Sequence, residues 1–459
     1  MKLPLWARAL DAVAIIMAII AVSVALTGGF RIVGARVSVT DWWRPLLFFA
    51  LVVIARHALI RRPPLPGRIA AGFAAWRRDP DTRTVLPIHL ATRLGVLAVG
   101  FCAVILIGFP PQAVNRWTIY QNDLLDLPAR WDAGWYMSIA SVGYSYESGS
   151  SAPYQQNIAF FPAYPMTVRF FAPLFGRQYL WTGVIVSIVA FYFALVYLLR
   201  LARSELANEG QAATAVMLTA AYPFALFFSA VYTESLFLLT LVAAVYHFRQ
   251  NQLWRSAIWG VACGLTRPPG CFLSVVLGLM AIKPMWSATG DRAQIVRRLL
   301  AASAPGFGML AFSAFIYRLT GHPFQWTMQN AAWGRVYKGL DEIVTTRIEL
   351  IADNGFYDYA ATQTIDLFYS LAVIVCLVAV WPVYRRFGLP YAVFILLNLL
   401  PPLSAGGMLS MGRVTAVIFP MFLWMGAAIP PHHRMGWITC FAVLQGFLAV
   451  MFYTWRPIF

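Results

Sequence analysis

The chain has 459 residues, of which 60% are hydrophobic and only 12% are charged, and its formal net charge is +17. Soluble domains are about half apolar and about one quarter charged, and a soluble chain of this length would divide into domains joined by polar linkers, which this sequence lacks. The composition therefore excludes an ordinary soluble enzyme and indicates a membrane protein.

The positive charge does not indicate a nucleic-acid partner. The Lys and Arg residues stand in short segments between apolar runs and do not form one basic patch, the arrangement in which such residues set membrane orientation. The five cysteines all fall inside apolar runs, where cysteine behaves as a small buried hydrophobic residue, so no disulfide framework is predicted.

Apolar runs of a length that can span a bilayer as a helix recur along the chain. They predict an all-α polytopic membrane protein with about 13 membrane helices, several of them short or re-entrant. In chain order these segments are residues 10–28, 46–60, 91–110, 179–200, 212–228, 232–248, 256–268, 270–282, 299–319, 366–384, 390–408, 414–430 and 436–454.

The chain is expected to have three parts. Residues 1–60 form two N-terminal spans, residues 61–90 form a basic cytoplasmic loop, and residues 91–459 form the main membrane domain. With the N-terminus in the cytoplasm, most Lys and Arg residues lie on the cytoplasmic side, as the positive-inside rule requires. Two long loops, 111–157 and 320–365, then face outward.

The first outer loop is predicted to contain a short helix. Asp126 can cap its first turn, Pro128 suits the first helical positions, and Gly143 can end it. Asp132 and Tyr136 are four residues apart and share one face. One interpretation is an interfacial helix with an aromatic belt, in which Asp132 is merely solvated; the other is a helix that presents a catalytic acid.

Three ionisable residues lie at or within apolar segments, where a charge is costly unless it is paired or hydrated. Glu234 follows Thr233 and is either a functional acid or part of a helix N-terminus. Arg267 lies in a hairpin that Thr266-Arg267-Pro268-Pro269-Gly270 breaks, and Arg413 ends another span. Each arginine either pairs with a carboxylate or lipid headgroup or clamps a phosphate.

The order of the motifs resembles the PIG-V-like mannosyltransferases of the GT-C superfamily, over roughly residues 85–455. Pro269 and Val414 depart from residues that family members often carry, Asn and Tyr. The matching motifs are Arg130-Trp131-Asp132 with Tyr136, Asn157 with Ala159-Phe160-Phe161-Pro162 and Tyr164-Pro165, Phe228-Ser229-Ala230 with Tyr232-Thr233-Glu234, Thr266-Arg267 with Gly270, and Gly412-Arg413.

The resemblance implies a GT-C type helix bundle and transfer of a hexose, most simply mannose, from a polyprenyl- or dolichyl-phosphate sugar to a lipid-linked or glycan acceptor. It implies inversion and a catalytic acid in the first outer loop. Asp132 is expected to act as general base, and Arg267 and Arg413 to stabilise the lipid phosphate. The candidates for acceptor or sugar binding are Arg130, Trp131, Trp135, Tyr136, Asn157, Tyr164, Tyr232 and Glu234.

No metal or other cofactor is expected, and the partners are the lipid-phosphate donor, the acceptor and membrane lipids. Asp79-Pro80-Asp81 is a poor metal site because it lies in a short basic segment. The outer loop 320–365 is expected to shape the acceptor site, through residues that include Trp326, Trp333, Arg335, Tyr337, Lys338 and Asp353.

Two other classes of protein remain open at this point. A transporter or lipid flippase would place ionisable residues near the bilayer midplane and often show two matching halves. A non-catalytic scaffold would keep the fold, and replacing Asp132 would leave its activity unchanged. The expected location is a bacterial inner membrane with the site on the periplasmic face, or the endoplasmic reticulum membrane in a eukaryote.

Overall fold

The computed structural model describes residues 4–27, 30–31, 38–39, 41–60, 64–111, 113, 116–148, 154–282 and 292–458. The chain forms two compact units. Unit 1 comprises Met1–Arg83 and Met166–Thr182, and unit 2 comprises Thr84–Pro165 and Gly183–Phe459.

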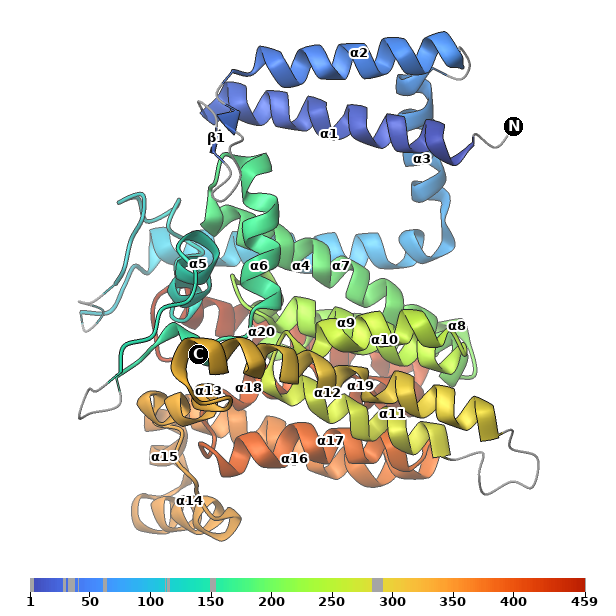
Figure 1. Ribbon diagram of the computed structural model, residues 1–459. Helices are drawn as coiled ribbons and strands as arrows, with labels where there is room; N and C mark the ends of the chain where they lie inside the picture. Colours follow the sequence, from blue (N-terminus) through green and yellow to red (C-terminus); the bar gives the residue numbers. More distant parts are fainter. Residues whose placement is uncertain are drawn as a thin grey trace. The chain divides into compact units, whose positions relative to one another are not determined.

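Unit 1 is helical apart from a two-residue antiparallel ladder (Figure 1). Its elements are α1 (Leu5–Thr27), β1 (Phe30–Arg31), β2 (Ser38–Val39), α2 (Trp43–Leu59), α3 (Leu65–Arg78), most of α6 (Ala163–Phe171) and η2 (Ala172–Phe175). Helices α1 and α2 lie side by side, and Asp11 of α1 forms ion pairs with Arg56 of α2 and Arg68 of α3. These buried ion pairs tie the three helices together.

Unit 2 is a bundle of helices that includes most of α4 (Pro80–Leu106) and of α7 (Tyr179–Glu205), whose first residues belong to unit 1. Its other elements are α5 (Ala133–Ser141), η1 (Asn157–Ala159), α8 (Glu209–Ala221), η3 (Pro223–Ser229), α9 (Glu234–Arg249), α10 (Leu253–Gly264), η4 (Pro268–Phe272), α11 (Leu273–Ile282), α12 (Arg292–Thr320), α13 (Gln325–Met328), η6 (Gln329–Trp333), α14 (Leu340–Asn354), α15 (Phe356–Thr362), α16 (Thr364–Phe387), α17 (Leu389–Ser404), α18 (Met411–Ala416), α19 (Phe419–Ala428), η7 (Pro431–His433) and α20 (Arg434–Tyr453).

Each of the thirteen apolar segments expected as a span overlaps a helix. Within the described residues, however, six helices are long and apolar enough to cross a membrane, or seven if the bent pair α8 and η3 forms one span. The chain is thus a multi-pass membrane protein, and the larger count of about 13 crossings stays a prediction. The six are in Trp6–Ala25, Pro80–Leu106, Tyr179–Glu205, Arg292–Thr320, Thr364–Phe387 and Pro431–Tyr453.

The segment 61–90, expected as a basic cytoplasmic loop, is largely helical in its described part, and its side of the membrane stays a prediction. Within its described part, residues Leu65–Arg78 form α3 and α4 starts at Pro80. Asp79 accepts a hydrogen bond from the backbone of Thr82, so the Asp-Pro-Asp sequence is a helix start. Proline suits this position because the first amides of a helix have no partner in the helix.

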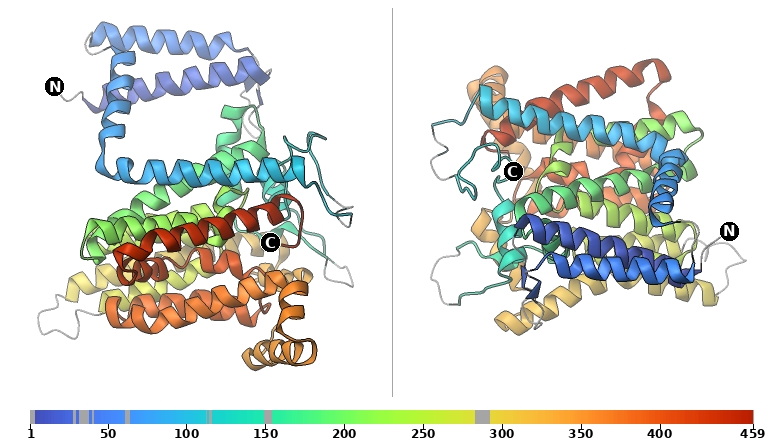
Figure 2. Two further views of the ribbon diagram at one scale, coloured as in Figure 1. Left: turned by 180° about the vertical axis from the view of Figure 1, so that it is seen from behind. Right: turned by 90° about the horizontal axis from the view of Figure 1, so that it is seen from above.

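The two long outer loops meet at one end of the bundle in unit 2. Helix α5 of the first loop and α13, α14 and α15 of the second lie at that end (Figure 1), whereas α8 and α19 run side by side elsewhere in the bundle. The side of the membrane on which the two loops lie stays a prediction. Helix α20 packs against α8 and η3 and ends close to the first loop (Figure 2).

The break between α8 and α9 is buried and fully supported by side chains. Tyr222 has an extended backbone because Pro223 follows it, and all seven residues of η3 are buried. Arg93 donates to the carbonyl oxygens of Ala220 and Ala225, and Gln445 donates to those of Ala220 and Tyr222. Irregular backbone inside a membrane protein requires such partners, so this break is rigid and fixes the start of α9.

Helices α10 and α12 approach each other through small residues. Gly260 and Gly264 are four residues apart on α10, and a Cβ added at Gly264 would overlap the carbonyl oxygen of Pro305 on α12. A Cβ added at Gly308 of α12 would likewise overlap the carbonyl oxygen of Val261. Small residues at this spacing let two membrane helices pack backbone to backbone. This contact fixes the end of α10, from which Thr266 and Arg267 continue.

Replacing Gly264 with Ala is expected to force α10 and α12 apart and to destabilise the protein by about 1–3 kcal/mol, the usual cost of overpacking. The midpoint of thermal unfolding in detergent should fall by several degrees. Gly278→Ala on α11 is the matched control, because a Cβ there meets no heavy atom within 4 Å. Equal midpoints for the two variants would contradict this description of the packing.

Candidate active site

Asp132 stands immediately before α5, at its N-cap position. The preceding residue, Trp131, has a left-handed backbone with φ of 45°, a conformation that a bulky residue rarely adopts. The predicted helix from Asp126 is therefore wrong in its start, although it ends at Val142 with Gly143 at φ of 105°. The turn at Trp131 directs the Asp132 side chain toward the interior of unit 2, where 23% of it is exposed.

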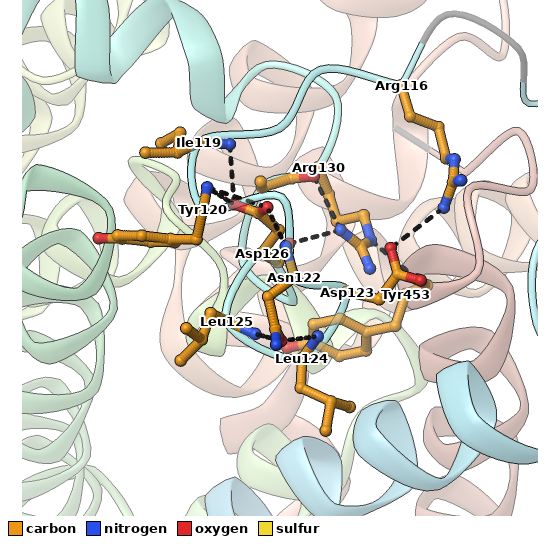
Figure 3. Close-up of polar contacts among 11 residues, drawn as sticks. Arg116, Ile119, Tyr120, Asn122, Asp123, Leu124, Leu125, Asp126, Arg130 and Tyr453 are labelled. Carbon is orange, nitrogen blue, oxygen red and sulfur yellow. Dashed lines mark hydrogen bonds and ion pairs between the residues drawn. The ribbon is translucent and has the colours of Figure 1, made fainter.

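A polar network holds the segment before Asp132 in place (Figure 3). The Asp126 carboxylate accepts hydrogen bonds from the backbone amides of Ile119 and Tyr120. Arg130 is 2% exposed and donates to the carbonyl oxygens of Asp126 and of Tyr453, at the end of α20. The loop is thus attached to the helix bundle just before the Trp131 turn, and this attachment fixes the position of Asp132.

A carboxylate–arginine network joins three distant parts of the sequence. Arg413 donates to Asp132 over 2.8 Å and to Glu234 over 2.6 Å. Arg267 donates to the same oxygen of Glu234 over 2.9 Å. Glu234 is fully buried, whereas the Arg267 and Asp132 side chains are 16% and 23% exposed. The network therefore begins in the protein interior and ends at two groups that reach solvent.

The backbone around Arg413 is as constrained as that around Asp132. Ser410, at the N-cap of α18, has φ of 61°, and a Cβ added at Gly412 would overlap the ring of Phe224. The guanidinium of Arg413 lies 4.4 Å from the centre of the Tyr232 ring, and the Tyr232 hydroxyl accepts from the backbone amide of Asp132. Tyr232 thereby supports both members of the Asp132–Arg413 pair.

A cavity of about 600 Å³ opens in front of this network. Among the described residues, Asp132 is the one carboxylate in its wall, which also contains three arginines, Arg267, Arg335 and Arg413. The polar end of the cavity is thus rich in positive charge and suits an anionic group. The remaining wall is mainly aromatic and apolar, and includes Tyr136, Phe160, Phe161, Phe272, Met309, Phe324, Trp326 and Trp333.

Arg335 is a cavity residue to which the sequence alone gave no separate role. Burial, together with the nearby charges of Arg413 and Arg267, lowers its pKa to about 10. Among the described residues, no carboxylate forms an ion pair with it, in contrast to Arg413. Its position follows Gly334, whose φ of 71° ends η6 and turns the chain toward the cavity. That Trp-Gly-Arg turn in an outer loop was the one sequence signal available.

The aromatic candidates divide into two groups. Tyr136 lines the cavity, and its ring meets those of Phe160, Tyr164 and Tyr232. Burial raises the pKa of Tyr136 to about 12, so its hydroxyl stays protonated at neutral pH. Trp135 lies just behind the lining and stacks on Phe160. Trp131 packs against Trp455, which supports the turn before α5, and it is not part of the cavity lining.

Three further candidates lie outside the cavity lining and are engaged with the backbone. Arg130 fixes the first outer loop, as described above. The Asn157 side chain donates to Gly143 and accepts from Ser145, which secures the end of α5. The Tyr164 hydroxyl donates to the carbonyl oxygen of Gly183. We therefore retain these residues as positioning residues and not as residues that contact a sugar.

No group of three or more His, Cys, Asp or Glu residues that could hold a metal ion occurs in the described part of the chain. The expectation that the reaction needs no metal stays a prediction. The positive charge at the polar end of the cavity comes from the three arginines.

The helices and the cavity define a multi-pass membrane protein with a cationic, carboxylate-containing site at one end of its bundle. Residues 104–318 match the family described as mannosyltransferase (PIG-V), which confirms the resemblance for this part of the chain. A curated relative, GPI alpha-1,6-mannosyltransferase 2 of Cricetulus griseus, is 28% identical over 201 residues. That match covers 40% of this chain and 39% of the relative, well short of the relative's full length.

Two solved structures of oligosaccharyltransferases from Archaeoglobus fulgidus show a distant overall similarity. For the archaeal oligosaccharyltransferase AglB, the TM-score is 0.40 at 10% identity, with 80% of this chain and 56% of that chain covered. For the second structure, the TM-score is 0.38 at 11% identity, with coverage of 83% and 56%.

Replacing Glu234 with Gln is expected to destabilise the protein on the order of 3–5 kcal/mol, because the buried Arg413 and the largely buried Arg267 lose their shared counter-charge. The measurement is thermal unfolding of the purified protein. Glu209→Gln provides the control, since Glu209 pairs with Arg203 at the surface with 56% of its side chain exposed, and exposed pairs contribute about 0–1 kcal/mol. A Glu234→Gln variant as stable as the control would show that the network does not organise the site.

Proposed function

We propose that this chain is a membrane glycosyltransferase that transfers mannose from a polyprenyl- or dolichyl-phosphate carrier to a lipid-linked or glycan acceptor. The reaction inverts the anomeric carbon and takes place on the non-cytoplasmic side. The observation that carries the proposal is the position of Asp132, a carboxylate at the mouth of a cavity that contains three arginines. The family match over residues 104–318 supports the choice of sugar.

The donor fits the two ends of the cavity. Its phosphate would lie against Arg267 and Arg335, whose guanidinium groups present planar sets of hydrogen-bond donors. Its isoprenoid stem would lie along the apolar wall, where Phe272 and Phe324 stand. A donor that enters from the membrane also removes the need for a soluble nucleotide-binding domain.

In the proposed step, a hydroxyl oxygen of the acceptor attacks the anomeric carbon and a new carbon–oxygen bond forms. The bond from that carbon to the phosphate oxygen breaks, and the lipid phosphate leaves with the electron pair. Asp132 accepts the hydroxyl proton. Arg413 holds one oxygen of Asp132 over 2.8 Å and orients the other toward the acceptor. Because one displacement occurs, the configuration inverts.

The arginines stabilise the charge that develops on the leaving phosphate. Fixed donors aimed at developing charge often make the largest single contribution to catalysis. Arg413 and Arg267 are held in place by Glu234 before the donor arrives, so no reorganisation is needed during the step. Arg335 is not held by a carboxylate within the described residues and is the group most available to the phosphate.

Replacing Asp132 with Asn is expected to reduce sugar transfer by about 10²–10⁴-fold, the usual contribution of a general base, with little change in folding. Purified protein in nanodiscs is incubated with polyprenyl-phosphate mannose and membrane lipid extract, and products are followed by mass spectrometry. Asp123→Asn in the same loop is the control, because Asp123 is exposed and pairs only loosely with Arg116. Transfer that persists in Asp132→Asn would remove Asp132 as the base.

The same assay separates the enzyme from the other two classes. A transporter would move the intact donor across a vesicle membrane without cleaving the sugar–phosphate bond. A scaffold would behave identically with and without the Asp132→Asn substitution and would need a second protein for any transfer. Donor-dependent product formation by the purified chain would exclude both.

Replacing Arg335 with Gln is expected to raise the KM for the donor about 10–100-fold, because a charge-assisted hydrogen bond contributes about 1.5–3 kcal/mol. Initial rates at varied donor concentration measure this effect. Arg318→Gln is the control, since Arg318 is exposed at the end of α12 and does not line the cavity. An unchanged donor KM in Arg335→Gln would show that the phosphate binds elsewhere.

A further inference from the structure

A second cavity of about 320 Å³ lies beside the first, and Leu409 lines both. Thr346 and Arg347 of α14 form one wall, Asp366 and Tyr369 of α16 form another, and the chain between Gly406 and Leu409 closes the third. Most of its lining residues come from the second outer loop, and they are not the residues of that loop, such as Phe324 and Arg335, that line the first cavity.

The charges of the second cavity balance. The wall contains two cations, Lys338 and Arg347, and two carboxylates, Glu342 and Asp366, and a hydrogen bond of 2.8 Å joins Arg347 to Asp366. The Tyr359 hydroxyl also donates to Asp366 over 2.6 Å, which fixes the carboxylate further. The wall therefore offers many hydrogen-bond donors and acceptors without net charge. Such a surface suits a ligand rich in hydroxyl groups, whereas the first cavity, with three arginines and one carboxylate, suits a phosphate.

One stretch of chain separates the two cavities, and its glycines let the neighbouring side chains approach. A Cβ at Gly406 would lie 3.3 Å from Arg335, which lines the first cavity. A Cβ at Gly407, where φ is 62°, would lie 3.5 Å from Lys338, which lines the second. Leu409 lines both cavities. A ligand in the second cavity is thus separated from the arginine end of the first by a single thin wall.

We propose that the second cavity binds the acceptor as an uncharged glycan and presents one of its hydroxyl groups, past Leu409, to the donor cavity. This inference rests on the proposed function and names the acceptor side of the same site. The separation of roles follows from charge: the phosphate of the donor is drawn to the cavity with excess arginine, and the neutral polyol binds where each cation is matched by a carboxylate.

The test fills the second cavity without touching the first. Thr346 lines the cavity and Thr345, beside it on α14, does not, although both are exposed and each hydroxyl donates to a helix carbonyl. Thr346→Trp places an indole in the cavity, and Thr345→Trp is the matched control. The full-length protein in nanodiscs is probed with methyl α-mannoside by saturation-transfer NMR, and donor binding is measured separately by the thermal shift with polyprenyl-phosphate mannose.

We expect the mannoside signal to be present in the wild type and Thr345→Trp and lost in Thr346→Trp, with the donor thermal shift equal in all three. In the transfer assay, the KM for acceptor lipid extract should rise about tenfold or more in Thr346→Trp alone, with the donor KM unchanged. A mannoside signal that is absent from the wild type or unaffected by Thr346→Trp overturns the proposal, as does its displacement by inorganic phosphate. A wild type that binds the mannoside in a Thr346-dependent manner but shows no donor shift would refute the proposed function and retain the glycan site.

Discussion

The site depends on one buried carboxylate. Glu234 is fully buried and accepts hydrogen bonds from both Arg267 and Arg413. A buried charge is stable only when it is paired and hydrogen-bonded. With one carboxylate between two guanidinium groups, Glu234 leaves one positive charge unbalanced, and the Asp132 carboxylate, which pairs with Arg413, balances it. The chemistry at the cavity surface is therefore set by a residue that no ligand can reach.

The bundle is built so that this network can exist. The rigid break at Pro223 fixes the start of α9 and with it Glu234. The close approach of α10 and α12 fixes the end of α10, and Arg267 lies between this end and η4, at the N-cap of η4. Irregular segments at membrane depth are costly on their own, and they are tolerated because their polar groups find partners in one place. The outer loops then add Asp132 and Arg335 to charges that are already positioned.

The second outer loop does more than cover one end of the bundle, because its residues line both cavities on either side of the wall between them. Arg335 and Lys338 are three residues apart, yet they face different cavities on either side of one chain segment. Under the proposed function, donor and acceptor are therefore recognised by neighbouring residues of a single loop. Loops carried by a rigid bundle are suited to such a division because they can vary without disturbing the core.

The sequence by itself determined the membrane class, the approximate positions of the thirteen apolar helical segments and the identity of Asp132, Glu234, Arg267 and Arg413 as the charges to consider. Apolar length and the steric effect of proline are local properties, so each of the thirteen segments overlapped a helix and the break at Arg267 was found. Only the tertiary structure decided that Arg413 joins Asp132 to Glu234, because those partners are 281 and 179 residues away from it. The same holds for Arg130, Asn157 and Tyr164, whose polar atoms are occupied by backbone groups, and for Arg335, whose loop carries no periodic signal. Helix packing and buried turns bring distant side chains together across a bundle. The local spacing of residues in the sequence predicts neither the packing nor the turns.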